Sequence, residues 1–153
     1  MNRALVLAAI VGCAHAELSE RHIIEVDVGD WVYRRYQKVE DIEFQVPNNS
    51  GVGHTAVYQT RDTMGRVNVP RSAMAVAFVT EYERAEDVKK YLEDKVQELK
   101  GYKIKKEKEF WRLSGDGDAW ALWASGKYIV KVGVPDGTTV PTELVTAYRQ
   151  VYP

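Results

Sequence analysis

The chain has 153 residues, of which 45% are hydrophobic and 28% are charged. This composition predicts one globular domain and excludes a disordered chain, which would have fewer apolar and aromatic residues. The formal net charge is -1, so we expect no nucleic-acid partner, because such binding depends on an excess of Lys and Arg. A chain of this length can bury enough surface to form a core by itself, and we expect no cofactor and no structural metal.

The first 16 residues are typical of a cleaved signal peptide. Arg3 gives a positive start, residues 4–11 form an uninterrupted apolar run, and Ala14 and Ala16 place small side chains where a signal peptidase requires them. The apolar run is too short to cross a bilayer, which takes about 20 helical residues. We therefore expect export, with residues 1–16 removed and residues 17–153 forming one domain.

A second cleavage pattern overlaps the first. Residues 10–13 (IVGC) resemble a bacterial lipobox, in which a signal of residues 1–12 is removed and Cys13 carries the lipid. Such a lipid would tether the domain to a membrane without spanning it. Cys13 is the single cysteine of the chain, so no disulfide is expected. The two patterns predict either a secreted protein or a membrane-anchored extracytoplasmic lipoprotein.

The N-terminal half predicts strands with no helix between them. Runs of β-branched and aromatic residues indicate strands, and Gly, Pro, Asn and Asp indicate the turns that separate them. The clearest loop is the run 47–53 (PNNSGVG), in which every residue but Val52 favours a turn. On this basis we expect strands at residues 21–28, 31–39, 42–46, 54–60 and 66–69.

The C-terminal half adds helices to the sheet. We expect a strand at 74–82, a helix at 85–100, an extended segment at 102–113, strands at 119–124 and 127–134, and a helix from Pro141. This β-α-β-β-β-α order predicts an α+β fold with a mainly antiparallel sheet and both helices on one face. The order of elements resembles that of the small α+β domains of the PsbP and Mog1 proteins, a resemblance that implies no residue role.

The helix expected at 85–100 has a single apolar stripe at helical spacing, formed by Val88, Tyr91, Leu92, Val96 and Leu99. Because this stripe must leave water, we expect it to cover the strand at 74–82. It would lie on one of two alternate sets of that strand, either Met74, Val76 and Phe78 or Ala75, Ala77 and Val79.

The sequence contains no Gly-x-Ser-x-Gly, P-loop or Gly-x-Gly-x-x-Gly motif. His22 and His54 have no third ligand at the spacing of a zinc site, so they predict no metal site. An alternative role for His54 is that of a general base assisted by Asp62 or Ser72. We expect instead that both histidines are ordinary polar residues of strands, and that the chain has no catalytic residue.

Acidic residues gather in the turn at 114–118 (SGDGD). Its alternate oxygen-bearing side chains suit calcium, but a full loop also needs a carboxylate at position 12, which counted from Asp116 is Lys127. Asp116 and Asp118 could act as an acid–base pair only if their environments differed, which a solvated turn does not provide. We expect a plain β-turn.

Three tryptophans are the candidate contacts with a partner or ligand: Trp111, Trp120 and Trp123. Trp120 and Trp123 are three positions apart, so on a strand they face opposite sides, and one can be exposed. An exposed indole can stack on a sugar or hold a protein partner, whereas the alternative is ordinary core packing.

A basic run and a glycosylation sequon are both expected at the surface. The basic run that contains Lys103, Lys105, Lys106 and Lys108 indicates a solvated edge strand, with contact to an anionic surface or acidic partner as the alternative. Asn48 begins an Asn-Asn-Ser sequon in a predicted exposed loop and is a candidate for glycosylation.

These observations favour an exported, non-catalytic binding or assembly module whose partner is an extracytoplasmic protein or carbohydrate. The first alternative is a small-ligand or lipid carrier, which requires an apolar cavity between the sheet and the helices. The second is a small extracytoplasmic hydrolase, which requires His54 or the 114–118 turn to face a deep cleft. A lipid on Cys13 would be the sole contact with a membrane.

Overall fold

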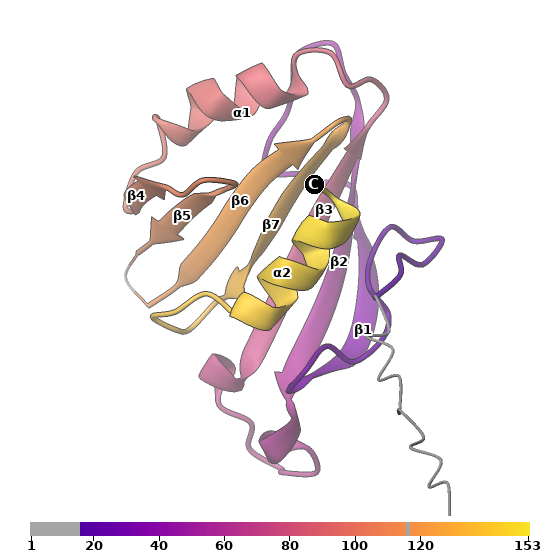
Figure 1. The fold of residues 1–153 in the computed structure, drawn as a ribbon, viewed down its shortest axis with the longest axis vertical. Coiled ribbons are helices and arrows are strands. Elements are labelled where there is room, and N and C mark those ends of the chain that lie inside the picture. Colours follow the sequence, from indigo (N-terminus) through magenta and orange to yellow (C-terminus); the bar gives the residue numbers. More distant parts are fainter. Residues whose placement is uncertain (1–15, 116) are drawn as a thin grey trace, which may run out of the picture.

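One antiparallel sheet lies at the centre of the fold (Figure 1). The computed structural model describes residues 16–115 and 117–153. The elements, in chain order, are β1 (Trp31–Val39), β2 (Gly51–Thr60), η1 (Arg61–Thr63), η2 (Arg71–Ala73), β3 (Met74–Tyr82), α1 (Val88–Val96), β4 (Lys103–Lys106), β5 (Trp111–Ser114), β6 (Ala119–Ser125), β7 (Tyr128–Val134) and α2 (Thr142–Val151).

The seven strands lie side by side in the order β1-β2-β3-β7-β6-β5-β4, and every neighbouring pair is antiparallel. The predicted α+β class, with a mainly antiparallel sheet and two helices, is confirmed. Cys13 and all residues of the predicted signal peptide except Ala16 fall outside the described residues, so export and lipidation stay predictions. Among the described residues, no helix is long and apolar enough to cross a membrane.

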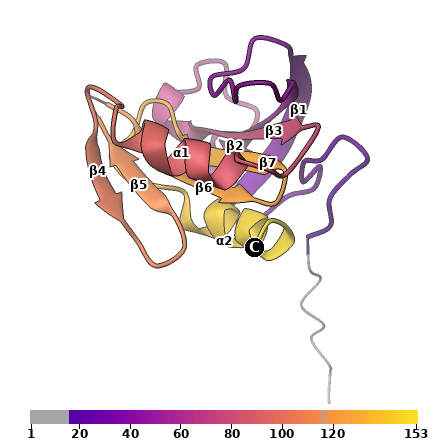
Figure 2. The ribbon, with the colours of Figure 1, turned by 90° about the horizontal axis from the view of Figure 1, so that it is seen from above.

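The two helices cover opposite faces of the sheet, so the prediction that both lie on one face is wrong (Figure 2). Side chains alternate along β6, where Ala121 and Trp123 belong to the cluster under α2 while Trp120 and Leu122 belong to the cluster under α1. Because β6 and β7 are buried on both faces for most of their length, each face needs its own apolar cover. We refer to these as the α1 face and the α2 face.

Helix α1 is shorter than predicted and lies over different strands. It spans Val88–Val96 rather than residues 85–100, and its buried side chains are Val88, Leu92 and Val96. They pack mainly over β6 and β7, so the expected cover of β3 is wrong. Within the two predicted sets of β3 residues, only Val76 borders the same cluster. The alternate set of β3 faces α2.

Several predicted strands are not strands. No β-ladder is formed by residues 21–28, 42–46 or 66–69, apart from a single bridge at Val28. Strand β2 begins three residues earlier than predicted, inside the expected loop. The segment expected to be extended at 102–113 is divided into β4 and β5. Segments 21–28 and 42–46 cross the two faces of the sheet and bury their apolar residues there, so burial rather than strand pairing explains their composition.

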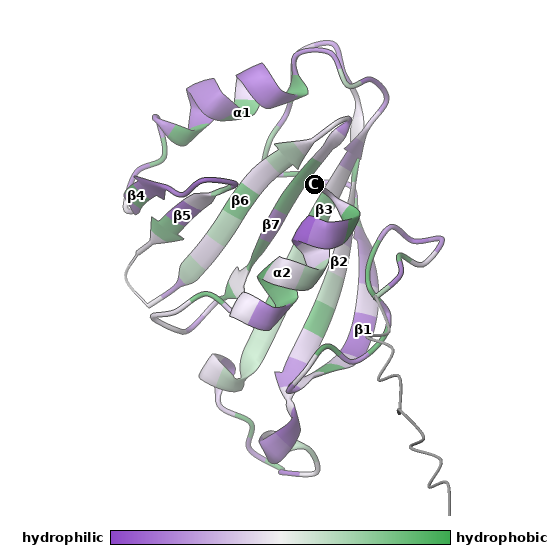
Figure 3. Cartoon of the chain, in the orientation of Figure 1, coloured by the Kyte–Doolittle hydropathy of each residue, from purple (hydrophilic) through white to green (hydrophobic). Residues whose placement is uncertain are grey.

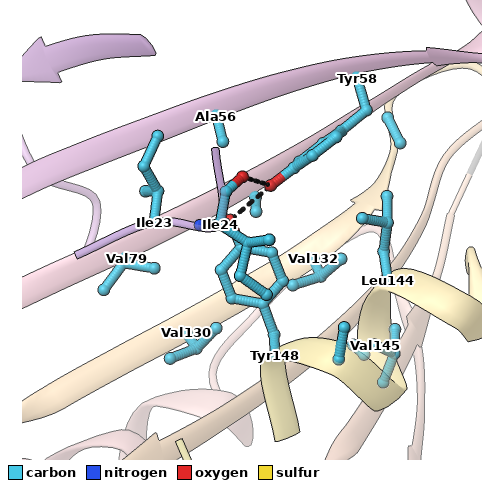
Figure 4. Packing of buried hydrophobic residues seen from close by; sticks show 14 of the residues in the cluster. Ile23, Ile24, Ala56, Tyr58, Val79, Val130, Val132, Leu144, Val145 and Tyr148 are labelled. Carbon is cyan, nitrogen blue, oxygen red and sulfur yellow. Dashed lines mark hydrogen bonds between the residues drawn. The ribbon is translucent and has the colours of Figure 1, made fainter. Parts of the chain in front are cut away.

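Two buried tyrosines supply the backbone hydrogen bonds that Ile24, in segment 21–28, does not find in a ladder (Figure 4). The Tyr58 hydroxyl donates to the carbonyl of Ile24 at 2.6 Å, and the amide of Ile24 donates to the Tyr148 hydroxyl at 3.1 Å. The two hydroxyl oxygens are 2.8 Å apart. Burial raises the pKa of both phenols. Neutral phenols thus replace a neighbouring strand as partners for this segment.

Hydropathy falls from the central strands toward the edges of the sheet (Figure 3). Strand β4, with three lysines in its four residues, is the outermost strand beside β5, which confirms the interpretation of the basic run as an edge strand. Charged side chains on an unpaired edge hinder the addition of strands from other molecules.

Candidate functional site

The strongest candidate site is a pocket on the α1 face. After β1, residues 40–46 cross this face as a strap that is fixed by the buried side chains of Phe44 and Val46. The strap and the strands beneath it enclose about 270 Å³. Its lining comes from Val39, the strap, β2, β3 and β7, and includes Ile42, Phe44, Phe78 and Ile129. The wall is therefore mainly apolar.

Glycine at position 53 allows the strap to lie close to the sheet. A Cβ atom there would lie 2.9 Å from the carbonyl oxygen of Val39 and 3.4 Å from Cγ2 of Ile42. The strap is also held by the hydroxyl of Tyr82, which donates to the carbonyl of Phe44. The pocket is thus a consequence of the backbone path between β1 and β2.

Polar groups in the pocket are few and mostly engaged. Lys131 is buried, donates to the Glu43 carboxylate at 2.9 Å and lies 4.5 Å from the centre of the Trp120 ring. The hydroxyl oxygen of Thr55 is buried without a hydrogen-bond partner among the described residues. With Asp41 also in the lining, the charged side chains give the pocket a small negative excess.

Phe78 is the apolar wall residue with the most exposed surface. Phe78 is 37% exposed, although it occupies the middle of β3. Its ring is tilted against that of Trp120, with ring centres 5.8 Å apart. Exposed aromatic surface beside a concave apolar wall is typical of a ligand site.

A second group of residues lies on the α2 face. Oε2 of Glu81 lies 3.0 Å from Nε2 of His22 and 3.7 Å from Nε2 of His54. The other carboxylate oxygen, Oε1, accepts a hydrogen bond of 2.8 Å from Lys127. The Nδ1 atom of His54 shares a hydrogen bond of 2.8 Å with the hydroxyl of Tyr36. We call His22, His54 and Glu81 the His-His-Glu cluster.

The surroundings favour neutral imidazole at His54 and ionised carboxylate at Glu81. Burial lowers the pKa of His54, and the neighbouring His22 lowers it further, whereas Glu81 opposes the shift. The hydrogen bond from Lys127 is the main cause that lowers the pKa of Glu81, while burial opposes it. Both shifts favour the forms of His54 and Glu81 that carry a free electron pair on a ring nitrogen and on a carboxylate.

The hypothesis of a base at His54 assisted by Asp62 or Ser72 is wrong in its partners. His54 pairs with Val79 near one end of β2, while Asp62 follows the other end and Ser72 precedes Met74, the partner of Gln59. Six residues of extended strand between His54 and Thr60 correspond to about 20 Å. The imidazole also faces the α2 side, away from the pocket that its backbone borders.

The turn at 114–118 is described except for Asp116, so the proposed calcium loop and the Asp116–Asp118 pair fall in part outside the described residues. Oδ2 of Asp118 accepts hydrogen bonds of 3.0 Å from both the Tyr102 hydroxyl and Nε1 of Trp120. Burial, and then the hydrogen bond to Asp118, raises the pKa of Tyr102 to about 12. Asp118 thus anchors neighbouring aromatic side chains.

The side chains of Trp120 and Trp123 lie on opposite faces of the sheet, as predicted, but the tryptophans are less exposed than contact with a partner requires. Trp120 and Trp123 lie on opposite faces, and both are buried, with 6% and 3% of their surface exposed. Trp111 is half-buried, and the Lys106 ammonium covers its ring at 4.3 Å from the centre. Of the two alternatives for Trp120 and Trp123, ordinary core packing is therefore the one observed, since the sheet is covered on both faces.

Trp111 and Trp123 do line a second, more polar pocket of about 280 Å³ beside the turn between β4 and β5. Nε1 of Trp123 donates to the carbonyl of Tyr152 at 2.8 Å, and the guanidinium of Arg149 lies 5.5 Å from its ring centre. Since neighbouring side chains already cover the faces of these rings, the pocket offers a ligand little aromatic surface.

Asn48, the candidate for glycosylation, is exposed in a turn and has a φ angle of 56°. Its carbonyl accepts a hydrogen bond of 2.7 Å from Arg84. The side chain is therefore accessible, while its attachment of a glycan stays a prediction.

Sequence reasoning missed both the pocket and Glu81. A lysine in the middle of the apolar strand that became β7 was a signal for a buried polar site, because a charged residue is rarely buried without a partner. Glu81 could be found only through the pairing of β2 with β3, which sets it diagonally across from His54 on one face.

No protein-family model and no curated protein matches the chain. Among solved structures, the chain is similar to the crystal structure of a GTP binding regulator from Thermotoga maritima, with 14% sequence identity and a TM-score of 0.46. The match covers 80% of this chain and 78% of that chain. At this level the similarity assigns no ligand or activity to the present chain.

Proposed function

We propose that this chain is an exported, non-catalytic binding module and that the strap pocket is its ligand site. The observation that carries the proposal is the apolar pocket walled by Phe78, a partly exposed aromatic residue in the middle of a strand. The expected position between the sheet and the helices is wrong, because the cavity lies between the sheet and the strap. An apolar cavity is nevertheless what a small-ligand carrier requires, so this form of binding module is the one that the geometry supports best.

Size and charge restrict the ligand. An engineered cavity of about 150 Å³ holds benzene, so a pocket of this volume suits roughly ten to twelve non-hydrogen atoms. Lys131 is neutralised by Glu43, and Asp41 adds a negative charge, so an anionic ligand would be repelled. The buried Thr55 hydroxyl provides one unused hydrogen-bonding group. We infer a small, neutral, mainly apolar ligand with one polar group.

The absence of catalysis is part of the proposal. Among the described lining residues, the carboxylate of Glu43 is engaged by Lys131, and the imidazole of His54 is directed to the opposite face. Neither provides the free base beside a nucleophile that a hydrolase requires. A protein or carbohydrate partner is less well supported, because the tryptophans that would hold it are buried or covered.

Binding can be tested with 2-naphthol, a neutral bicyclic probe with one hydroxyl, and with the anionic 2-naphthoate of similar shape. The full-length protein should bind 2-naphthol more tightly, by about tenfold, as expected for a difference of about 1.4 kcal/mol. Isothermal titration measures both affinities. Tighter binding of 2-naphthoate would contradict the charge argument, and no measurable binding of either probe would contradict the ligand site.

A matched pair of variants locates the probe. Phe78→Ala removes apolar wall and should weaken 2-naphthol binding at least fivefold, whereas Val67→Ala, at a side chain 97% exposed elsewhere, should leave it unchanged. Both variants retain the apolar N-terminal residues, so any binding of 2-naphthol to those residues contributes equally to the two measured affinities. Equal affinities of the two variants would show that the probe binds outside the pocket.

Export has its own test. The protein recovered from its native host should begin at Glu17, or at a lipidated Cys13, because the signal is removed during secretion. Intact mass and N-terminal sequencing distinguish these two products. A mature chain that still begins at Met1 would rule out both.

A further inference from the structure

The His-His-Glu cluster brings together three electron-pair donors from separate parts of the chain. His22 comes from the segment before β1, His54 from β2 and Glu81 from β3, and their ligand atoms all lie within 4.8 Å of one another. The cluster occupies the α2 face, so it is separate from the proposed ligand pocket. Glu81 supplies the third ligand that the two histidines lack in the sequence.

The two distances from Glu81 are close to those between the ligands of a tetrahedral ion. With zinc bonds of about 2.0–2.1 Å, two ligand atoms of a tetrahedral site lie about 3.3–3.4 Å apart. The observed separations from Oε2 of Glu81 are 3.0 Å to His22 and 3.7 Å to His54, one on each side of that value. All three ligand atoms lie within 4.8 Å of one another, so side-chain rotations can bring them to bonding distance of one ion.

The neighbouring residues already orient the donor atoms. Tyr36 engages Nδ1 of His54, which leaves Nε2 directed at Glu81, and a partner on the other ring nitrogen is the usual companion of a metal-bound histidine. Nε2 of His54 is buried and has no hydrogen-bond partner among the described residues. Such unpaired buried polar atoms are rare in native proteins. Lys127 occupies one oxygen of Glu81 and leaves the other to the imidazoles.

We propose that His22, His54 and Glu81 bind one zinc ion, through Nε2 of each histidine and Oε2 of Glu81, with water as the fourth ligand. Two imidazoles and one carboxylate suit zinc, whereas calcium and magnesium prefer oxygen ligands throughout. His22 and Glu81 are partly exposed, so an ion and a water molecule can reach the cluster. The ion would link the segment before β1 to the two strands beneath it.

The direct test is a titration with zinc sulfate in a buffer that does not bind metals. The full-length protein is used with Cys13→Ser and His15→Ala, so that these two potential ligands do not contribute. We expect one zinc ion per chain, and a melting temperature that rises by roughly 5–10 °C at a zinc concentration of about 100 times Kd. Failure to bind zinc below about 100 μM would overturn the proposal.

Variants of the ligands identify the site. Glu81→Gln, His54→Gln and His22→Asn should each lower the zinc affinity at least tenfold; Asn is chosen at position 22 because the backbone there has a φ angle of 63°, which Asn tolerates. The matched control, Glu83→Gln, removes an exposed carboxylate two residues from Glu81 and should bind zinc as the parent does. Equal affinity of Glu81→Gln and Glu83→Gln would place the ion elsewhere.

A measurement without further substitution covers the case in which a ligand variant does not fold. In nitrogen-15 NMR spectra of the folded parent, zinc should shift the Nε2 resonances of both His22 and His54, because those atoms bind the ion. Shifts confined to Nδ1, or unchanged imidazole signals at saturating zinc, would contradict the proposed coordination.

Discussion

Replacing Leu92 with alanine is expected to lower the free energy of unfolding by about 2–5 kcal/mol, the usual cost of truncating a buried leucine. Leu92 is 2% exposed and lies in the middle of α1, where it packs into the cluster formed with β5, β6 and β7. α1 is a short helix, and a short helix depends on tertiary packing for its stability. Loss of this contact should therefore destabilise the helix and the cluster together.

The neighbouring residue provides the control. Glu93→Ala changes an exposed side chain on the polar side of α1 and should change the free energy by about 0.5 kcal/mol or less. Urea denaturation of the two variants and the parent gives both values, with unchanged m-values if only stability is affected. Equally mild effects at the two positions would mean that α1 does not pack on the sheet as described.

The apolar stripe of α1 was predictable from the sequence, but the face it covers was not. Spacing within a helix shows which side must be buried, and the alternation in β6 shows that both of its sides are apolar. Neither pattern states which helix covers which side, because that depends on the order of strands in space. Here β7 lies between β3 and β6, so the strand that precedes α1 is not the main surface beneath it.

Segments 21–28 and 42–46 show a similar limit. Their apolar residues correctly indicated burial, and Ile23, Ile24, Phe44 and Val46 are all buried. The same composition did not distinguish a strand from a segment that crosses a sheet face, since both bury β-branched and aromatic side chains. The backbone of Ile24 is satisfied by tyrosine hydroxyls supplied by β2 and α2, and such long-range partners leave no local signal.

The candidate sites were the least predictable part. The pocket depends on a strap whose path is set by a close approach at Gly53, and the His-His-Glu cluster depends on the register between β2 and β3. Both require pairs of residues that are distant in the sequence. By contrast, the alternation along β6 correctly placed Trp120 and Trp123 on opposite faces, and both are core residues because each face of the sheet is covered. The spacing alone left open whether one of them is exposed.

Gly133→Ala is expected to lower the free energy of unfolding by about 3 kcal/mol, at the upper end of the usual cost of adding a group to a packed core. Gly133 lies in β7 opposite Trp120 of β6, and the indole rests against its backbone. A Cβ atom would lie 2.3 Å from the carbonyl oxygen of Ala119 and 2.5 Å from Cε3 of Trp120. Neither contact can be relieved by rotating a flexible side chain.

Displacement of Trp120 should give the Gly133→Ala variant a second, spectroscopic effect. The indole is held by its hydrogen bond to Asp118 and lies beside Lys131 and Phe78. Its near-ultraviolet circular dichroism depends on these fixed surroundings and should therefore change when the indole is displaced. Gly65→Ala is the control, because it adds the same methyl group in open space at a φ angle of 80°. It should cost only the strain of a left-handed backbone, about 1–2 kcal/mol. If Gly133→Ala were as mild as Gly65→Ala, with an unchanged Trp120 signal, β6 and β7 would not pack as closely as described. The Trp120 indole would then be free to move beside Phe78 and Lys131, the two residues of the pocket lining that it contacts.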